Sequence, residues 1–189
     1  MEKEIEVLDL EKTTDIPVKK EKKKDSLLIM NIKVLIKKVV FIILLVYILF
    51  FHIFGLVRIK NNAMTPNIAA GDLLLYYRLD KKYNVGDVVT FNLNDRNYIL
   101  RVVAVEGDVV NKGTNGDLLI NGDIEYHKTY LKNSFPSVNR IKYPYKVPKG
   151  KVFVVGDYRS EYNDSRVFGA ISTNTIKGKV IGLIQTKDI

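Results

Sequence analysis

The stretch VVFIILLVYILFFHIFGLV, from Val39 to Val57, decides how this chain is organised. Its 19 residues carry no formal charge, since His52 can stay neutral. As an α-helix the stretch would be about 28 Å long, which is close to the thickness of the hydrocarbon core of a bilayer. A buried helix of a water-soluble domain would alternate between apolar and polar faces, whereas this stretch is apolar all round. It therefore predicts one transmembrane helix over residues 39–57.

The charges on either side of the apolar run predict its orientation. Eight lysines lie between Lys19 and Lys38, whereas only Arg58 and Lys60 follow the run closely. By the positive-inside rule, residues 1–38 form a basic cytoplasmic tail and residues 58–189 lie outside the cell. The run is longer than the apolar part of a usual signal peptide and lacks the small residues of a cleavage site. We therefore expect an uncleaved, single-pass anchor in the cell membrane.

Composition excludes several kinds of site. The 189 residues include no cysteine, which rules out disulfides and thiolate metal sites, and only two histidines. We therefore expect no metal and no cofactor. The net charge of the chain is +9. Residues 1–18 contribute −4, residues 19–38 contribute +6, and the part after the apolar run contributes +7. Because the membrane segment accounts for the lysine-rich run, we do not expect a nucleic-acid partner.

After Arg58 the sequence changes to short runs of β-type residues between turn signals. These runs occupy residues 73–79, 87–93, 97–107, 117–122, 151–157 and 177–186. Asn121-Gly122 is a strong signal for a tight hairpin. Residues 127–146 are polar and rich in Tyr, Asn and Pro, which indicates a long loop or insertion. The pattern predicts a mostly β fold, in which an antiparallel, barrel-like β domain follows one N-terminal transmembrane helix.

Three motifs in this domain resemble the boxes of the type I (Ser/Lys) signal peptidase family. Residues 61–75, NNAMTPNIAAGDLLL, are similar to its Ser-Met-x-Pro box, which is followed by Gly-Asp and a strand. Residues 98–108, YILRVVAVEGD, are similar to its Lys-Arg box, which ends in Gly-Asp. Residues 147–171, VPKGKVFVVGDYRSEYNDSRVFGAI, are similar to its Gly-Asp-Asn-Arg…Asp-Ser-Arg box. The resemblance implies a β domain of the signal peptidase type.

The catalytic side chains of that family are missing at the matching positions. The resemblance implies a serine nucleophile at Ala63 and a lysine base at Leu100, and a methyl group cannot attack a carbonyl carbon, nor can leucine accept a proton. The hydroxyl that steadies the lysine is replaced by Tyr162. Arg101 cannot act as the base because a guanidinium stays protonated. We therefore expect no intact catalytic group and no Ser/Lys proteolysis.

Other residues match family positions that have structural or binding roles. The resemblance implies that Asp164 and Arg166 form an ion pair beside the site. It also implies turn positions at Gly156, Asp157 and Gly169. A substrate-binding role is implied for the residues of the first box, which are Asn61, Met64 and Pro66.

These observations lead to a main hypothesis of a catalytically inactive signal peptidase homologue. It would bind secreted precursor proteins as an extended strand and act as a chaperone or scaffold. Inactive relatives occur in pilus gene clusters of Gram-positive bacteria, so the resemblance implies a role in assembling pilin subunits. Sortase or an active signal peptidase would be further partners.

Two alternatives stay open at the level of sequence. The first is an active signal peptidase-like serine endopeptidase with a non-standard catalytic group, for example Ser160 or Ser165 with Lys177. The second is binding of the cationic domain to anionic wall polymers, which its net charge of +7 suggests.

Overall fold

The computed structural model describes residues 19–114, 116–125, 141–160 and 163–186. The chain divides into two compact units, with the boundary between Val46 and Tyr47. Most of the long loop expected over residues 127–146 lies outside the described residues, and so does Tyr162.

The N-terminal part of the described chain is one long helix. Helix α1 (Lys19–Ile48) continues into a π-helical turn, η1 (Leu49–Ile53). The stretch Leu28–Ile53 has a mean hydropathy of 2.7, so it is long and apolar enough to cross a membrane. We expected the helix to cover residues 39–57. It begins earlier, and it ends at Ile53 because the next residues form strand β1 (Phe54–Arg58) and pair with β2.

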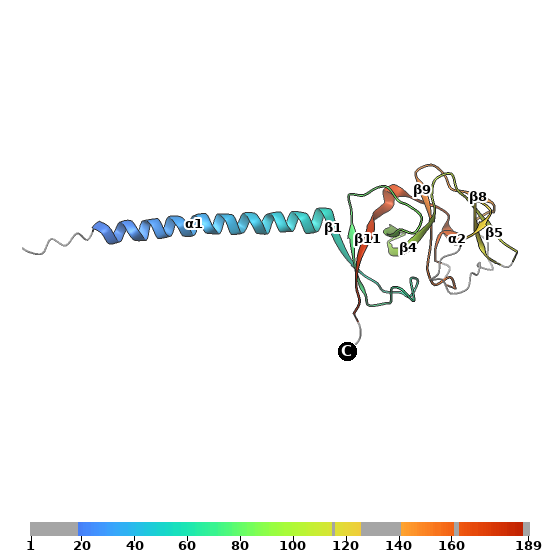
Figure 1. Cartoon of the computed structure of the whole chain (residues 1–189), viewed down its shortest axis with the longest axis horizontal. Coiled ribbons are helices and arrows are strands. Elements are labelled where there is room, and N and C mark those ends of the chain that lie inside the picture. Colours follow the sequence, from blue (N-terminus) through green and yellow to red (C-terminus); the bar gives the residue numbers. More distant parts are fainter. Residues whose placement is uncertain (1–18, 115, 126–140, 161–162, 187–189) are drawn as a thin grey trace, which may run out of the picture. The chain divides into compact units, whose positions relative to one another are not determined.

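A seven-stranded sheet, antiparallel at every pairing, forms the larger part of the β domain (Figure 1). Its strand order is β1-β2-β11-β3-β4-β9-β10. The further strands are β2 (Leu73–Tyr77), β11 (Ile176–Ile184), β3 (Val88–Leu93), β4 (Arg96–Ala104), β9 (Lys151–Val155) and β10 (Ile171–Ser172).

A second sheet of four strands has the order β7-β6-β5-β8. Its strands are β5 (Val109–Lys112), β6 (Leu118–Ile120), β7 (Asp123–Ile124) and β8 (Tyr145–Lys146). The predicted hairpin is confirmed: Ile120 pairs with Asp123, and both residues between them have positive φ angles, 56° for Asn121 and 99° for Gly122. This is the backbone that a two-residue turn of this type requires. Short helices α2 (Ser165–Phe168) and η2 (Thr173–Thr175) lie between β9 and β11.

Three clusters of buried apolar residues stabilise the β domain. One cluster contains Ala63 and Leu100 together with residues of β3, β9 and β11. The second packs Phe153 against the four-stranded sheet, and the third surrounds Met64. Leu100 is 1% exposed and Met64 0%. The expectation of an antiparallel β domain after an apolar helix is confirmed, and the segment that carries Ala63 packs into the core of that domain.

Strand β11 depends on a glycine where it crosses β2. A β-carbon on Gly178 would collide with the backbone carbonyl oxygen of Tyr77 and lie 2.7 Å from Cδ2 of Tyr76. We expect Gly178→Ala to lower the free energy of unfolding by about 1–3 kcal/mol, as overpacking does. Gly182→Ala, where the nearest atom is the Leu75 Cβ at 3.6 Å, is the control on the same strand. Urea unfolding of the full chain in detergent measures both, and equal effects would contradict the close contact at Gly178.

Candidate functional site

Ala63 lies in the turn between β1 and β2 and is held against the segment that follows β9. It is 7% exposed, and its carbonyl oxygen accepts a hydrogen bond of 2.9 Å from the Tyr158 N–H. A β-carbon on Gly156 would lie 2.7 Å from that same carbonyl oxygen. Because real β-carbons do not approach an oxygen so closely, only glycine fits at position 156. The glycine therefore lets the two segments approach each other.

Leu100 reaches the same place from strand β4. It shares an apolar cluster with Ala63, and its Cδ2 would lie 3.6 Å from a β-carbon at Gly156. The structure thus brings together the two positions that the sequence predicted to have lost their catalytic groups. They line a small pocket together with Asn61, Tyr98, Ile99, Gly156, Asn163 and Asp164.

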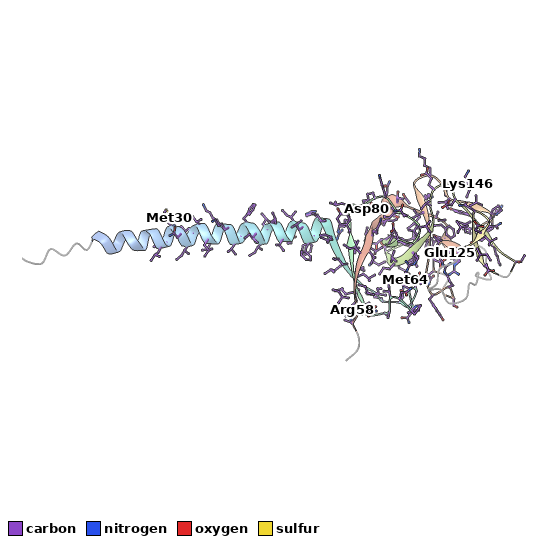
Figure 2. All side chains as sticks on the ribbon, viewed as in Figure 1. Met30, Arg58, Met64, Asp80, Glu125 and Lys146 are labelled. Carbon is purple, nitrogen blue, oxygen red and sulfur yellow. The ribbon has the colours of Figure 1, made fainter. Side chains whose placement is uncertain are left out.

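The pocket is small. Its free volume is about 10 Å³, close to the room that one water molecule needs. Ala63 contributes a methyl group and Leu100 an isobutyl group, so neither position offers a nucleophile or a base. Asn61 is exposed at the edge of the pocket. Met64, labelled in Figure 2, is fully buried in the β domain and packs in one cluster with Ile59 and Ile68.

A buried ion pair stands beside the pocket. Asp164 and Arg166 are 1% and 2% exposed, and the Arg166 Nη2 lies 2.7 Å from the Asp164 Oδ2. The same carboxylate begins α2 by accepting the Arg166 backbone N–H, and it also accepts the N–H of Gly156 at 3.3 Å. Arg166 in turn donates to the carbonyl oxygen of Arg159. These contacts fix the wall of the pocket formed by Gly156, and Gly169 ends α2 with a φ angle of 79°.

Asp157 belongs to a second charged group that the sequence indicated only in part. Its side chain is fully buried and accepts two hydrogen bonds from Arg101, at 2.8 and 2.7 Å. It also accepts one at 3.1 Å from the Asn67 amide. Arg101 donates further to the Gly86 carbonyl oxygen. The group ties β4, the turn after Met64 and the end of β9 to one another.

The sequence placed Asp157 at a turn but missed its partner Asn67. The sequence did contain a signal for Arg101. Side chains alternate between the two faces of a strand, so Arg101 must face the side of β4 opposite to that of Leu100. Nothing in the sequence indicated Asn67, which lies in an irregular turn.

Near Asp164 there is also a buried phenol. Burial raises the pKa of Tyr143, and the Asp164 carboxylate adds to this shift while Arg166 opposes it. Tyr143 therefore stays a neutral phenol and supplies no general base. Within the described ranges, no three or more His, Cys, Asp or Glu side chains are grouped to hold a metal ion.

The alternative catalytic residues are not brought together in the described part of the chain. The Ser165 hydroxyl is fully buried and accepts the Val154 N–H at 3.0 Å. The Lys177 ammonium group donates to the side chain of Asn97 at 2.7 Å. Ser160 is exposed, and no contact joins it to Lys177.

Beside the pocket, one edge of β4 has no neighbouring strand among the described residues. Strand β3 pairs with β4 from Arg96 to Arg101, whereas β9 pairs with β4 only from Arg101 onward. The backbone of residues 96–100 therefore faces the pocket on its β9 side without a strand partner there. Such an edge can accept an added peptide strand.

The buried pair of Arg101 and Asp157 yields a prediction about stability. Asp157→Asn removes the charge that compensates a guanidinium whose side chain is only 13% exposed. We expect a loss of about 3 kcal/mol in the free energy of unfolding, because breaking a buried pair leaves one charge uncompensated. Urea unfolding of the full chain in detergent checks this. Asp80→Asn is the control. It should lower the free energy of unfolding much less, because Lys179 would still pair with the Asp87 carboxylate. Similar losses in both variants would contradict the bracing role.

Comparison with known proteins shows which family the sequence resembles. A family model described as signal peptidase, peptidase S26, matches residues 32–184. The chain is 31% identical over 139 residues to signal peptidase I of Bacillus caldolyticus. This match covers 65% of this chain and 74% of that protein. It is 33% identical over 142 residues to signal peptidase IB of Staphylococcus aureus strain N315, with coverages of 65% and 73%.

A solved signal peptidase I from Enterococcus faecalis V583 is also similar, with a TM-score of 0.45 and 22% identity over 53% of this chain and 97% of that chain. The family assignment comes from the sequence matches, because the family model spans most of the chain and the curated relatives are matched over more than two thirds of their length. The chain belongs to the signal peptidase family, peptidase S26.

Proposed function

We propose that this protein is a non-catalytic signal peptidase homologue that binds an extended segment of a secreted precursor protein at the membrane. It acts as a chaperone or scaffold, in pilus assembly at a Gram-positive surface. The observation that carries the proposal is an edge of β4 that has no strand partner among the described residues. It lies beside a pocket that holds Ala63 and Leu100 in place of a nucleophile and a base.

The chemistry of the pocket supports the loss of catalysis. A serine–lysine pair needs a hydroxyl and a neutral amine within hydrogen-bond reach. Ala63 and Leu100 provide neither, and both are buried in one apolar cluster. Within the described residues, the serines and the lysine considered as replacements do not contact one another. Signal peptidase relatives imply secreted precursors as the class of protein that such a site binds.

The strand edge supports the retention of binding. A peptide added along residues 96–100 would form backbone hydrogen bonds, and these do not depend on any catalytic side chain. One small side chain of that peptide would point into the pocket, whose free volume of about 10 Å³ excludes large groups. Asn61, exposed at the edge, is placed to contact the peptide.

The apolar helix supports a location at the membrane. A stretch of this length and composition is consistent with a membrane anchor as in signal peptidases. The lysines before it favour a cytoplasmic N-terminus, so the β domain faces the secreted side. There it would meet precursors whose signal segments are still in the membrane.

Cleavage assays test the loss of catalysis. The full chain in detergent should show no turnover of a precursor substrate. The double variant Ala63→Ser plus Leu100→Lys should show slow cleavage, because a lysine buried as Leu100 is would be partly deprotonated by desolvation. Either single variant should be inactive and serves as the control. Turnover by the unmodified chain would contradict the proposal and support an endopeptidase with a non-standard catalytic group.

Crosslinking in the native cell tests the retention of binding. A photo-reactive residue at Asn61, which is exposed and lines the pocket, should capture secreted precursors near their signal segments. The same residue at Asn174, which is also exposed but lies in η2, is the matched control. Mass spectrometry identifies the captured proteins. Equal capture at both positions, or no precursor at Asn61, would place the function on another surface.

A further inference from the structure

The positive charge of the β domain comes from one stretch of the sequence. Residues 127–151 contain seven basic residues and no acidic one, whereas the rest of the chain from Arg58 onward has 13 of each. The net charge of +7 after the anchor is therefore the charge of this stretch. The structure describes its last part, residues 141–151, which carries Lys142, Lys146, Lys149 and Lys151. Peptide binding at β4 makes no use of this charge.

Residues 141–148 divide their side chains between two faces. The side chains at odd positions pack in one apolar cluster with Phe153; they are Ile141, Tyr143, Tyr145 and Val147. The side chains at even positions are exposed; they are Lys142, Pro144, Lys146 and Pro148. Side chains alternate in this way along an extended segment. Lys142 and Lys146 therefore share the outward face, and the exposed Lys149 follows directly.

The backbone of this segment is held by its neighbours. Strand β8 pairs with β5, and the Val147 N–H donates to the Asp108 carbonyl oxygen at 2.8 Å. The Tyr145 hydroxyl accepts the Ala170 N–H at 3.2 Å. The lysines thus extend from a backbone that is already ordered, so a ligand that binds them does not have to order the segment first.

The four lysines form no ion pair with another described residue. Two carboxylates lie beside them, and both are bound to other groups. The Glu106 carboxylate accepts the Gly150 N–H at 2.8 Å. The Asp108 carboxylate accepts the Val105 N–H at 2.8 Å and the Asn121 amide at 2.9 Å. Because four ammonium groups lie beside only two carboxylates, this surface stays positive.

The position of β8 in the domain argues against lipid phosphates as its ligand. Strand β1 directly follows η1, the last turn of the apolar stretch. Figure 1 shows β5 and β8 at the end of the β domain remote from β1, and Figure 2 labels Lys146 far from Arg58. The headgroups of a bilayer that held the apolar stretch would be nearest to the β1 end. The lysines belong to the other end.

We propose that Lys142, Lys146, Lys149 and Lys151 bind an anionic polymer of the cell wall whose charges are phosphodiesters. All cations of residues 141–151 are lysines, which bind phosphate as point charges, whereas the planar fork of arginine suits carboxylates. The tyrosine rings of the segment pack in the apolar cluster and offer no surface on which nucleic-acid bases could stack. Charges along an extended segment suit a linear polymer. The inference rests on the extracellular location in the proposed function and does not depend on peptide binding.

Lysine footprinting tests the assignment residue by residue. Full-length protein in detergent is treated with an amine-acetylating reagent, with and without poly(glycerol phosphate), and mass spectrometry measures the modification of each lysine separately. The basic tail before the anchor therefore does not enter the comparison. We expect several-fold protection of Lys142, Lys146 and Lys149, and loss of this protection at high salt, because exposed charges are screened. Lys60 and Lys82, exposed elsewhere on the domain, should stay reactive. Equal protection of Lys60 and Lys82 would overturn the proposal.

A pair of double variants tests whether the lysines act together. Lys142→Gln with Lys146→Gln should lower the protection of Lys149 several-fold. Lys60→Gln with Lys82→Gln removes the same charge and should leave the protection of Lys149 unchanged. Equal losses with both pairs, or no loss with the first, would overturn the proposal.

Further probes separate the wall polymer from other anionic partners. Polyglutamate of the same charge should protect Lys142, Lys146 and Lys149 less, and equal protection would indicate an acidic protein and overturn the proposal. Protein reconstituted in vesicles should show the same reactivity of these lysines with and without phosphatidylglycerol, and protection by this lipid would overturn it too. Precursor capture at Asn61 should not change in the variant Lys142→Gln with Lys146→Gln. A loss of capture would assign the lysines to precursor binding instead.

Discussion

The rest of the candidate site depends on the close approach of two backbone segments, one around Ala63 and one around Gly156. The Tyr158 N–H reaches the Ala63 carbonyl oxygen at 2.9 Å, and the absence of a β-carbon at Gly156 makes this distance possible. Two buried ion pairs hold the segment around Gly156, Arg101 with Asp157 and Arg166 with Asp164. The first of them is linked to the turn after Ala63 by the Asn67 amide, which donates to Asp157. If this contact opened, the pocket beside the edge of β4 would lose one of its walls.

None of these bracing contacts needs a nucleophile or a base. Burying an ion pair costs free energy of desolvation, but removing one partner costs more because it leaves a buried charge uncompensated. Such a pair therefore maintains the local geometry whether or not the site catalyses a reaction. The Asp164 carboxylate illustrates this, since it caps α2, pairs with Arg166 and accepts the Gly156 N–H. Shape and reactivity are thus separable in this fold, because the contacts that hold the site do not involve a nucleophile or a base.

The sequence predicted the parts of the molecule that follow from local patterns. The apolar run, the Asn121-Gly122 hairpin and five strands of the seven-stranded sheet each have a periodicity or a turn signal of their own; these strands are β2, β3, β4, β9 and β11. The end of the helix at Ile53 was not predictable, because residues 54–57 continue the uncharged apolar run and become part of a strand only by pairing with β2. Asn67 was missed for the same kind of reason: its contact with Asp157 joins residues 90 positions apart. Local signals cannot specify such pairings.

The leucine at position 100 also has a physical consequence for the domain itself. A lysine at a position that is 1% exposed would have to give up its proton or remain charged in an apolar cluster, and either costs free energy. Leucine removes this cost and fills the space with apolar contacts to neighbours such as Val102 and Val154. Catalytic sites often lower the stability of the fold that carries them. Under the proposed function, binding without cleavage, the pocket is free of that constraint and can be packed as the rest of the core is.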